Sequence, residues 1–303
     1  MNKKEKKHEH PINNKYQEAF DSFLPAGTKA SIERSVADII EKEYDKAYTA
    51  STLRFLYSTI DLTTLSPKDN KTSIHNFVEA VNKKYESKEN NLPSVAAICV
   101  YPAHIKQVKA ELKDPSVRIA SVSGGFPASQ TLMETKLMET SFAVTDGANE
   151  IDIVLNIGEF LDEDWQNVDL EIREQKEHAT HAKLKVIIES GLLEDPELIR
   201  RAAIMSIFSG ADFVKTSTGK DCPGATLEAA YTIARVIKEY YDKFDVRCGI
   251  KVSGGIRTPQ EAVKYYCIIK SVLGEEWLTN ELFRIGASSL EGNLRKAISE
   301  MEG

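Results

Sequence analysis

The feature that most constrains the fold is an alternation of strand-like and helix-like segments from about residue 50 onward. Runs rich in β-branched and apolar residues predict eight strands. Their ranges are 57–62, 94–101, 118–123, 150–156, 183–189, 213–217, 249–253 and 284–288. Helical periodicity separates them, for example at 72–85, 132–146, 196–208, 227–241 and 259–273. Repeated β-α alternation indicates a parallel sheet, and eight strands favour an α/β fold of the closed (β/α)8 (TIM) barrel type. No GxGxxG motif follows the first strand, which counts against a doubly wound dinucleotide-binding sheet.

The residues before this alternation divide into a tail and a helical extension. Residues 1–15 are polar and rich in lysine, so we expect a disordered tail. Residues 16–49 show two amphipathic segments, the first ended by Pro25 and Gly27 and the second beginning near Ser31. We therefore expect a helical extension over 16–49 that packs on a barrel domain formed by residues 50–303.

The composition excludes several classes of protein. The chain has 303 residues, 42% of them hydrophobic, and a net charge of −7, which argues against nucleic-acid binding as its main task. Its four cysteines are scattered without a CxxC pair, which indicates reduced thiols and a cytoplasmic location. No apolar run approaches the ~18 residues of a membrane span, and the lysine-rich start lacks the apolar core of a secretory signal.

Lys215 lies within the strand-like run 211–220, which reads Ala-Asp-Phe-Val-Lys-Thr-Ser-Thr-Gly-Lys. A lysine in such a strand is unusual, because an unpaired ammonium is costly to bury. Burial can lower the pKa of a lysine until it is a neutral amine near pH 7, which is the nucleophile of Schiff-base chemistry. Lys215 is therefore the first candidate catalytic residue.

Strand parity supplies neighbours for Lys215. Side chains alternate between the two faces of a strand, so Asp152, Lys215 and Lys251 all point into the barrel if their apolar neighbours face the helices. A structural ion pair between Asp152 and one lysine is the alternative to a catalytic site. Two lysines and one acid leave an excess positive charge inside the barrel, however, and loss of a proton from one lysine is the least costly way to remove it. This imbalance favours an enzyme.

Three glycine-containing loops predict a site for phosphate. Two follow the sixth and seventh predicted strands and the third ends the eighth, and glycine lets backbone N–H groups approach an anion. The candidate phosphate ligands are Gly219, Lys220, Gly254, Gly255, Arg257, Gly286 and Ser288. The first loop is not a Walker A motif, because Val214 occupies its first glycine position and Asp221 follows Lys220.

Several segments resemble deoxyribose-phosphate aldolase, a class I aldolase family with the (β/α)8 fold. The similar segments are 61–65, 95–102, 147–154, 185–191, 210–220, 249–258 and 284–289, in family order over roughly residues 50–300. The Lys-Thr-Ser-Thr-Gly-Lys stretch that begins at Lys215 is the most specific of them.

The resemblance implies reversible cleavage of 2-deoxy-D-ribose 5-phosphate to D-glyceraldehyde 3-phosphate and acetaldehyde. It implies that Lys215 forms the Schiff base, that Lys251 lowers the pKa of Lys215, and that Asp152 relays protons. It also implies no metal or organic cofactor, a phosphosugar as partner, and a homo-oligomer of two or more chains. The chain ends at Gly303 without the C-terminal tyrosine that assists proton transfer in some members.

The sequence allows two interpretations of Cys99 and two alternative functions for the chain. Cys99, within the segment 95–102, is either a core cysteine or a thiol near the pocket that reacts with the aldehyde product. The chain could be another Schiff-base barrel aldolase, acting on a different phosphorylated sugar or a keto acid. It could also be a catalytically silent barrel that binds sugar phosphates, although all three ionisable residues are present.

Overall fold

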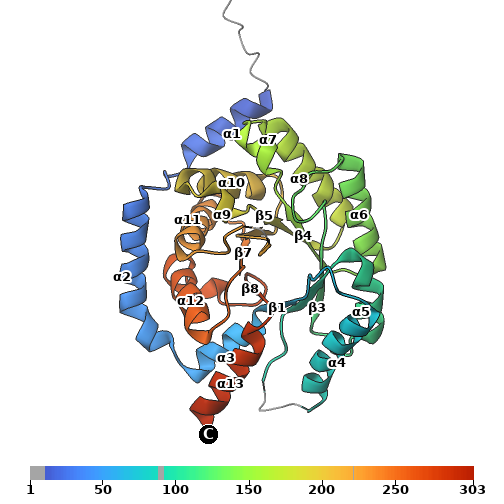
Figure 1. Ribbon diagram of the computed structural model, residues 1–303. Coiled ribbons are helices and arrows are strands. Elements are labelled where there is room, and N and C mark those ends of the chain that lie inside the picture. Colours follow the sequence, from blue (N-terminus) through green and yellow to red (C-terminus); the bar gives the residue numbers. More distant parts are fainter. Residues whose placement is uncertain (1–10, 88–91, 221) are drawn as a thin grey trace, which may run out of the picture.

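Eight parallel strands form a closed barrel at the centre of the molecule (Figure 1). The computed structural model describes residues 11–87, 92–220 and 222–303. The strands run in sequence order and β1 pairs with β8, which closes the barrel. They are β1 (Ile60–Thr63), β2 (Ala97–Val100), β3 (Arg118–Val122), β4 (Glu150–Val154), β5 (Lys183–Ile187), β6 (Phe213–Lys215), β7 (Gly249–Ser253) and β8 (Phe283–Ala287). The predicted (β/α)8 barrel is confirmed.

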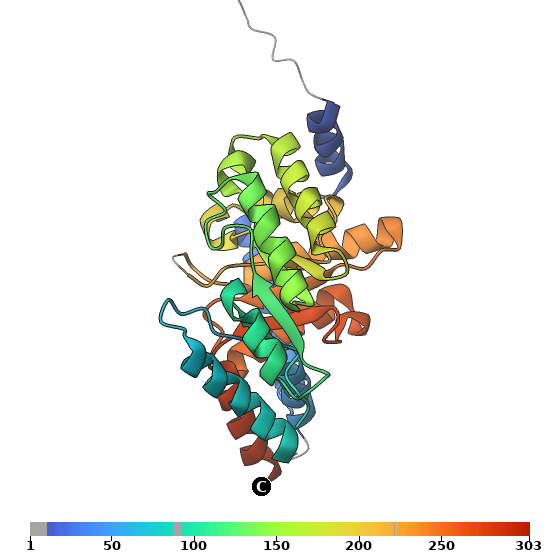
Figure 2. The same ribbon diagram turned by 90° about the vertical axis from the view of Figure 1, so that its right-hand side faces the viewer.

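Helices connect successive strands and surround the barrel (Figures 1 and 2). Five match the expected helical ranges closely: α4 (Lys71–Ser87), α6 (Met133–Asp146), α10 (Pro196–Phe208), α11 (Leu227–Phe244) and α12 (Pro259–Leu273). The others are α5 (Ile105–Glu111), α7 (Ile157–Leu161), α8 (Trp165–Ala179), α9 (Ser190–Leu193) and α13 (Leu290–Glu302), with 3₁₀ turns at Pro102–His104 and Glu275–Trp277. No helix of the described ranges combines the length and apolar character needed to cross a membrane.

The first predicted strand begins too early. Residues 57–58 belong to a helix, α3 (Ala50–Ser58), and β1 starts only at Ile60. The Thr49 hydroxyl caps this helix by accepting a hydrogen bond from the Thr52 N–H. The buried residues Leu53, Leu56 and Tyr57 share one face at helical spacing. The run of apolar residues in this region therefore combines a helix face with a short strand.

The N-terminal extension consists of two helices on the outside of the barrel. Helix α1 spans Pro11–Ser22, so residues 11–15 are helical rather than part of a disordered tail. The tail expected over residues 1–10 lies outside the described residues. Helix α2 (Lys29–Ala47) begins two residues before the predicted start at Ser31, because the Thr28 side chain caps it. Figure 1 shows α2 running along the outer side of α11 and α12.

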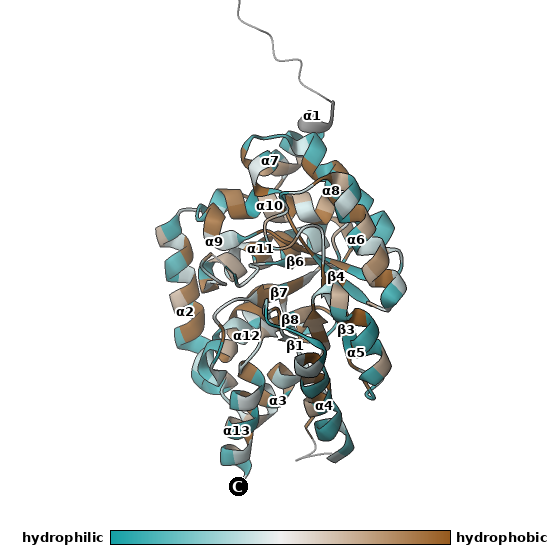
Figure 3. Cartoon of the chain, turned by 45° about the vertical axis from the view of Figure 1, so that its right-hand side comes forward, coloured by the Kyte–Doolittle hydropathy of each residue, from teal (hydrophilic) through white to brown (hydrophobic). Residues whose placement is uncertain are grey.

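The strands separate an apolar outer layer from a polar interior. Alternate residues such as Ile151, Val214 and Ile250 pack against the helices in the main hydrophobic core. Figure 3 shows this apolar character concentrated in the strands, with hydrophilic residues over much of the helical surface. On the inner face, a Cβ on Gly249 would lie 2.3 Å from the Phe213 ring, so glycine leaves the space that this phenyl ring fills. The interior that remains is where the charged residues lie.

Candidate active site

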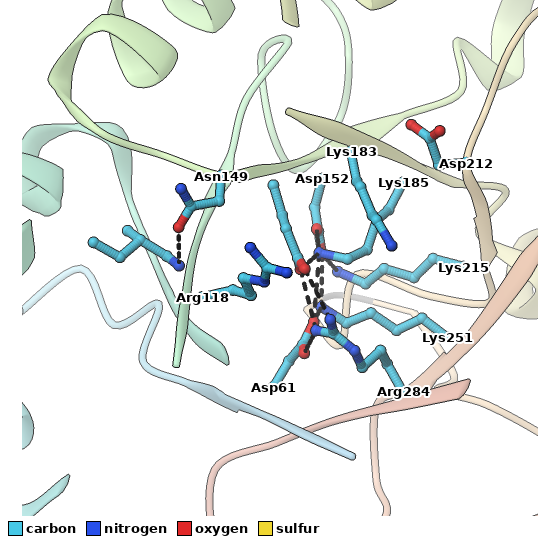
Figure 4. A network of polar contacts seen from close by, with 12 residues as sticks. Asp61, Arg118, Asn149, Asp152, Lys183, Lys185, Asp212, Lys215, Lys251 and Arg284 are labelled. Carbon is cyan, nitrogen blue, oxygen red and sulfur yellow. Dashed lines mark hydrogen bonds and ion pairs between the residues drawn. The ribbon is translucent and has the colours of Figure 1, made fainter. Parts of the chain in front are cut away.

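Three charged side chains meet inside the barrel, where β4, β6 and β7 approach their C-terminal ends (Figure 4). One oxygen of Asp152, Oδ2, accepts a hydrogen bond from Lys215 Nζ at 2.8 Å and another from Lys251 Nζ at 2.7 Å. Lys215 and Lys251 are direct partners in the β6–β7 ladder, which holds their side chains side by side. All three side chains are buried. The structure therefore brings together the three residues that strand parity placed inside the barrel.

Four further buried charges join this cluster. Lys185 Nζ donates to Asp152 Oδ1 at 2.8 Å and lies 2.5 Å from Glu150 Oε2. Arg284 bridges two acids, with Nη1 2.7 Å from Asp61 Oδ1 and Nη2 2.8 Å from Glu150 Oε1. A continuous network of ion pairs thus crosses the barrel interior (Figure 4).

These four residues were not predicted as site residues, although the sequence carried a signal for them. Asp61 and Lys185 open segments that resemble the aldolase family, whereas the charged residues predicted to face the interior all lie on the fourth, sixth and seventh strands. Glu150 has the same parity as Asp152 within β4, and Arg284 has the same parity as Gly286 within β8. Alternation of side chains along every strand therefore places all four residues inside the barrel.

The network contains one more positive group than negative groups. Its cations are Lys185, Lys215, Lys251 and Arg284, and its carboxylates are those of Asp61, Glu150 and Asp152. The wider network keeps the imbalance that the sequence suggested for two lysines and one acid. Buried excess charge is costly, so one cation is under pressure to lose its proton.

The contacts decide which cation that is. Lys215 contacts one carboxylate, Asp152, and shares the same oxygen with Lys251. Lys251 also lies 2.5 Å from Asp61 Oδ2, and Lys185 contacts three carboxylates. An arginine side chain does not lose its proton in proteins. Lys215 is therefore the cation whose positive charge is least compensated.

The pKa shifts of the two central lysines have opposite directions. Burial, followed by the positive charge of Lys251, lowers the pKa of Lys215 against the opposing effect of Asp152. Burial alone would also lower the pKa of Lys251, but the carboxylates of Asp152 and Asp61 outweigh burial and raise it. The surrounding lysines hold the pKa of Asp152 well below its usual range although burial opposes them, so this carboxylate stays ionised. The arrangement can supply a neutral amine beside a fixed ammonium and a fixed carboxylate.

A pocket of about 190 Å³ connects these lysines to the predicted phosphate loops. Lys215 and Lys251 line it, and so do six of the seven candidate phosphate ligands: Gly219, Gly254, Gly255, Arg257, Gly286 and Ser288. Gly254 and Gly255 have φ of +89° and +84°, which a residue with a side chain rarely adopts. A Cβ on Gly286 would lie 2.8 Å from Ser253 Cβ and 3.1 Å from Lys251 Cε. Glycine at these positions keeps the pocket open above the lysines.

The seventh candidate, Lys220, is not among the residues that line this pocket. Its Nζ donates a hydrogen bond to the backbone carbonyl of Leu65 and lies 5.9 Å from the centre of the Tyr101 ring. Lys220 thus links the loop after β6 to the loop after β1 in this structure.

Cys99 belongs to a small apolar cluster inside the barrel. It packs with Ala97, Ala120, Val122 and Leu65, and it is buried. Burial raises the pKa of its thiol, which lowers the reactivity of the sulfur. These surroundings favour the core cysteine over the reactive thiol. No group of three or more His, Cys, Asp or Glu residues that could hold a metal ion occurs within the described ranges.

Comparison with known proteins identifies the family of the chain. Residues 55–272 match the model of the DeoC/LacD family of aldolases. The chain belongs to this family. The aldolase is 39% identical to a putative deoxyribose-phosphate aldolase of Caenorhabditis elegans over 262 residues, 85% of each chain. It is 35% identical to the deoxyribose-phosphate aldolase of Homo sapiens, over 90% of this chain and 88% of the human one.

Solved structures show the same architecture. A putative deoxyribose-phosphate aldolase from Coccidioides immitis superimposes with a TM-score of 0.67 at 25% identity, covering 90% of this aldolase and 99% of that chain. The deoxyribose phosphate aldolase of Aeropyrum pernix, described as a unique tetramer, gives a TM-score of 0.65 at 25% identity, covering 86% and 97%. The family membership makes the chain a lyase of the aldolase class.

Proposed function

We propose that this aldolase cleaves 2-deoxy-D-ribose 5-phosphate reversibly to D-glyceraldehyde 3-phosphate and acetaldehyde, in the breakdown of deoxynucleosides. The observation that carries the proposal is the position of Lys215. It is the least compensated cation of the buried network, and it opens on the glycine-lined pocket. The names of the Caenorhabditis elegans and Homo sapiens relatives support the choice of substrate.

Lys215 is the proposed nucleophile. Its neutral amine attacks the C1 aldehyde of the open-chain substrate, and loss of water from the carbinolamine gives an iminium ion. The C2–C3 bond then breaks as the C3 hydroxyl loses its proton. The electron pair of the C2–C3 bond passes into the iminium, which leaves an enamine on Lys215 and releases D-glyceraldehyde 3-phosphate. Protonation of the enamine at C2 and hydrolysis of the resulting iminium release acetaldehyde and regenerate the amine.

Lys251 and Asp152 have proposed supporting roles. The ammonium of Lys251 lowers the pKa of Lys215, and Asp61 helps to keep that ammonium charged. Asp152 begins the cycle as a carboxylate and accepts a proton during carbinolamine formation, which it returns, directly or through a water, in a later step. The iminium itself is the electron sink, so the mechanism uses no metal or organic cofactor.

The phosphate is proposed to bind where the loops after β6, β7 and β8 meet. Backbone N–H groups of the glycine loops would donate to its oxygens, and the exposed side chain of Arg257 would contribute charge. Lys220 remains a proposed ligand, and reaching the pocket requires it to leave the Leu65 carbonyl.

Trapping the imine tests this mechanism. Borohydride added with acetaldehyde should leave a reduced imine on the peptide that contains Lys215, and Lys215→Leu should abolish both the label and retro-aldol turnover. A label on another lysine, or undiminished turnover of Lys215→Leu, would refute the assignment. Release of acetaldehyde from other phosphosugars or keto acids, but not from 2-deoxyribose 5-phosphate, would favour the other Schiff-base aldolases.

We further propose a homo-oligomer, a cytoplasmic location, and a division of the chain into an extension at 16–49 and a barrel at 50–303. The tetrameric Aeropyrum pernix relative supports the oligomer, and the four free cysteines support the location. Light scattering during size-exclusion chromatography tests the oligomer, and cell fractionation tests the location. Truncation tests the division into extension and barrel.

A further inference from the structure

A second cavity, of about 350 Å³, lies between the N-terminal extension and the barrel. Ile32 of α2, Ile199 of α10 and Ala229 of α11 form its apolar walls, and the loops after β5 and β6 complete it. We call it the α2 cavity. It shares no lining residue with the pocket that contains Lys215. Its volume is within the usual range for small-molecule sites.

A buried hydroxyl in the α2 cavity lacks a partner. Ser190 lines the cavity with only 3% of its surface exposed, and its Oγ makes no hydrogen bond within the described residues. Buried polar groups are nearly always paired, because an unpaired one loses its bonds to water without replacement. A bound molecule with a polar group would satisfy Ser190.

The charges around the α2 cavity favour a cation. Glu33, Glu194 and Glu228 line it, opposed by a single cation, Lys29. None of the three carboxylates has a salt-bridge partner in the part of the chain that the structure describes. An apolar wall with excess carboxylate at its rim suits an organic cation. A phosphate, which suits the glycine loops near Lys215, would be repelled here.

The loop after β6 is a wall shared by the α2 cavity and the phosphate pocket. Pro223 lines the α2 cavity, and the next residue, Gly224, lies so close to Gly254 that a Cβ on it would be 2.2 Å from the Gly254 carbonyl oxygen. The Ala225 N–H donates to the carbonyls of Ser253 at 2.9 Å and of Gly254 at 3.2 Å. Gly254 in turn lines the phosphate pocket. A molecule that holds Pro223 in place therefore also fixes the backbone that faces the phosphate.

We propose that the α2 cavity binds a small organic cation with an apolar body, and that its occupancy tightens binding of the phosphorylated substrate. Binding at the cavity is independent of the aldolase proposal, whereas the effect on substrate rests on it. By linkage, substrate must tighten binding of the cation by the same factor.

Benzamidine is a suitable probe, because its neutral and anionic analogues benzamide and benzoate have nearly the same shape. Methyl NMR of Ile32 and Ile199 should show saturable shifts with benzamidine at millimolar concentration, as expected for a small fragment. Benzoate should cause none. The double variant Glu33→Gln/Glu228→Gln should weaken benzamidine binding at least about fivefold. Equal binding of all three probes, or no loss in the double variant, would overturn the proposal.

Ser190→Ala provides a second test that needs no ligand. Removing an unpartnered hydroxyl should leave the unfolding midpoint of the free protein unchanged or higher. The same change should weaken the binding of benzamidine. The matched control is Ser206→Ala, which removes a buried hydroxyl that donates to the Ala202 carbonyl at 2.7 Å and should lower the midpoint. A loss of stability in Ser190→Ala as large as in Ser206→Ala would show that the Ser190 hydroxyl is already satisfied and count against the site.

The effect on substrate is measured separately. Saturating benzamidine should lower KM for 2-deoxyribose 5-phosphate by about fivefold in the wild type, the lower end of typical coupling. The double variant should need at least about fivefold more benzamidine for the same decrease in KM. Saturable methyl shifts with an unchanged KM would refute the coupling. If the protein proves inactive on this substrate, titration of inorganic phosphate with and without benzamidine reports the same coupling, so failure of the aldolase proposal is distinguished from failure of this one.

Discussion

At the scale of single residues, Lys215 and Lys251 show how position decides chemistry. Both are buried lysines on adjacent strands, and both donate to the same oxygen of Asp152. Lys251 also has Asp61, which keeps it charged, whereas Lys215 has no second carboxylate. The proposal that Lys215 rather than Lys251 is the nucleophile therefore rests on one acidic neighbour, Asp61.

Lys251→Met should move the pH profile of retro-aldol activity. The substitution leaves three cations and three carboxylates in the network, so the pressure on Lys215 to lose its proton disappears and its pKa rises. Activity at pH 7 should fall at least about tenfold, because a rise of about one unit in the pKa of Lys215 leaves about one tenth as much neutral amine. Activity should recover partly at higher pH. The acidic limb of kcat/KM against pH reports the shift.

Lys183→Met is the control for this experiment. Lys183 is partly exposed and pairs with Glu281 outside the network, so its loss should leave the profile unchanged. An unchanged profile in Lys251→Met would show that Lys251 does not tune Lys215.

At the scale of elements, local signals predicted helices better than the edges of strands. Helix α12 begins at Pro259 after a capping box in which the Thr258 hydroxyl accepts from the Glu261 N–H and the Glu261 carboxylate accepts from the Thr258 N–H. Short parallel strands lack such boundaries, because apolar residues continue into the flanking helix or loop. The first predicted strand accordingly includes Tyr57 and Ser58 of α3, because the apolar face of this helix runs almost directly into the apolar residues of β1.

Thr258→Ala should destabilise the protein by about 1 kcal/mol through loss of this cap. Chemical denaturation measures the change in the free energy of unfolding. Thr258→Ser keeps the accepting oxygen and should cost much less, so equal losses in the two variants would argue against capping as the cause.

Deletion of residues 1–49 should lower the thermal unfolding midpoint of the barrel. Helix α2 covers an apolar strip on which Ile32 and Val36 pack against Ile268, and α1 buries Phe20 against Trp165. Removing both helices exposes these surfaces to water. A truncated protein with the full-length midpoint would show that the extension contributes nothing to the fold.

At the scale of the whole molecule, barrel closure assembles the proposed active site. The ion-pair network draws residues from β1, β4, β5, β6, β7 and β8, and Arg284 of the last strand contacts Asp61 of the first. No pair of consecutive strands contains the complete arrangement. The chemistry therefore depends on the ring being closed.

The network should make the protein sensitive to acid. Folding lowers the pKa of Asp61 and Asp152, mainly because nearby lysines and Arg284 outweigh the effect of burial. A carboxyl with a lowered folded pKa contributes stability that is present above its unfolded pKa of about 3.9 and is lost as the pH falls below that value. The urea midpoint should thus be nearly constant from pH 6 to 5 and decrease steeply below about pH 4.

Asp61→Asn separates this effect from general acid unfolding. It should reduce stability at pH 7, by about 3–5 kcal/mol for a broken buried pair, and also flatten the acid dependence. A wild-type midpoint that does not change between pH 6 and pH 3 would contradict the stabilising role of the network.

The sequence alone determined the barrel, the inward direction of Asp152, Lys215 and Lys251, and the glycine loops around the pocket. These follow from periods of two and 3.6 residues and from glycine geometry, which are local properties. Only the tertiary structure showed that Asp61, Glu150, Lys185 and Arg284 complete the network, because closure brings distant strands together. It also decided that Lys215 is the under-compensated cation, since a buried charge depends on every neighbour within a few ångströms.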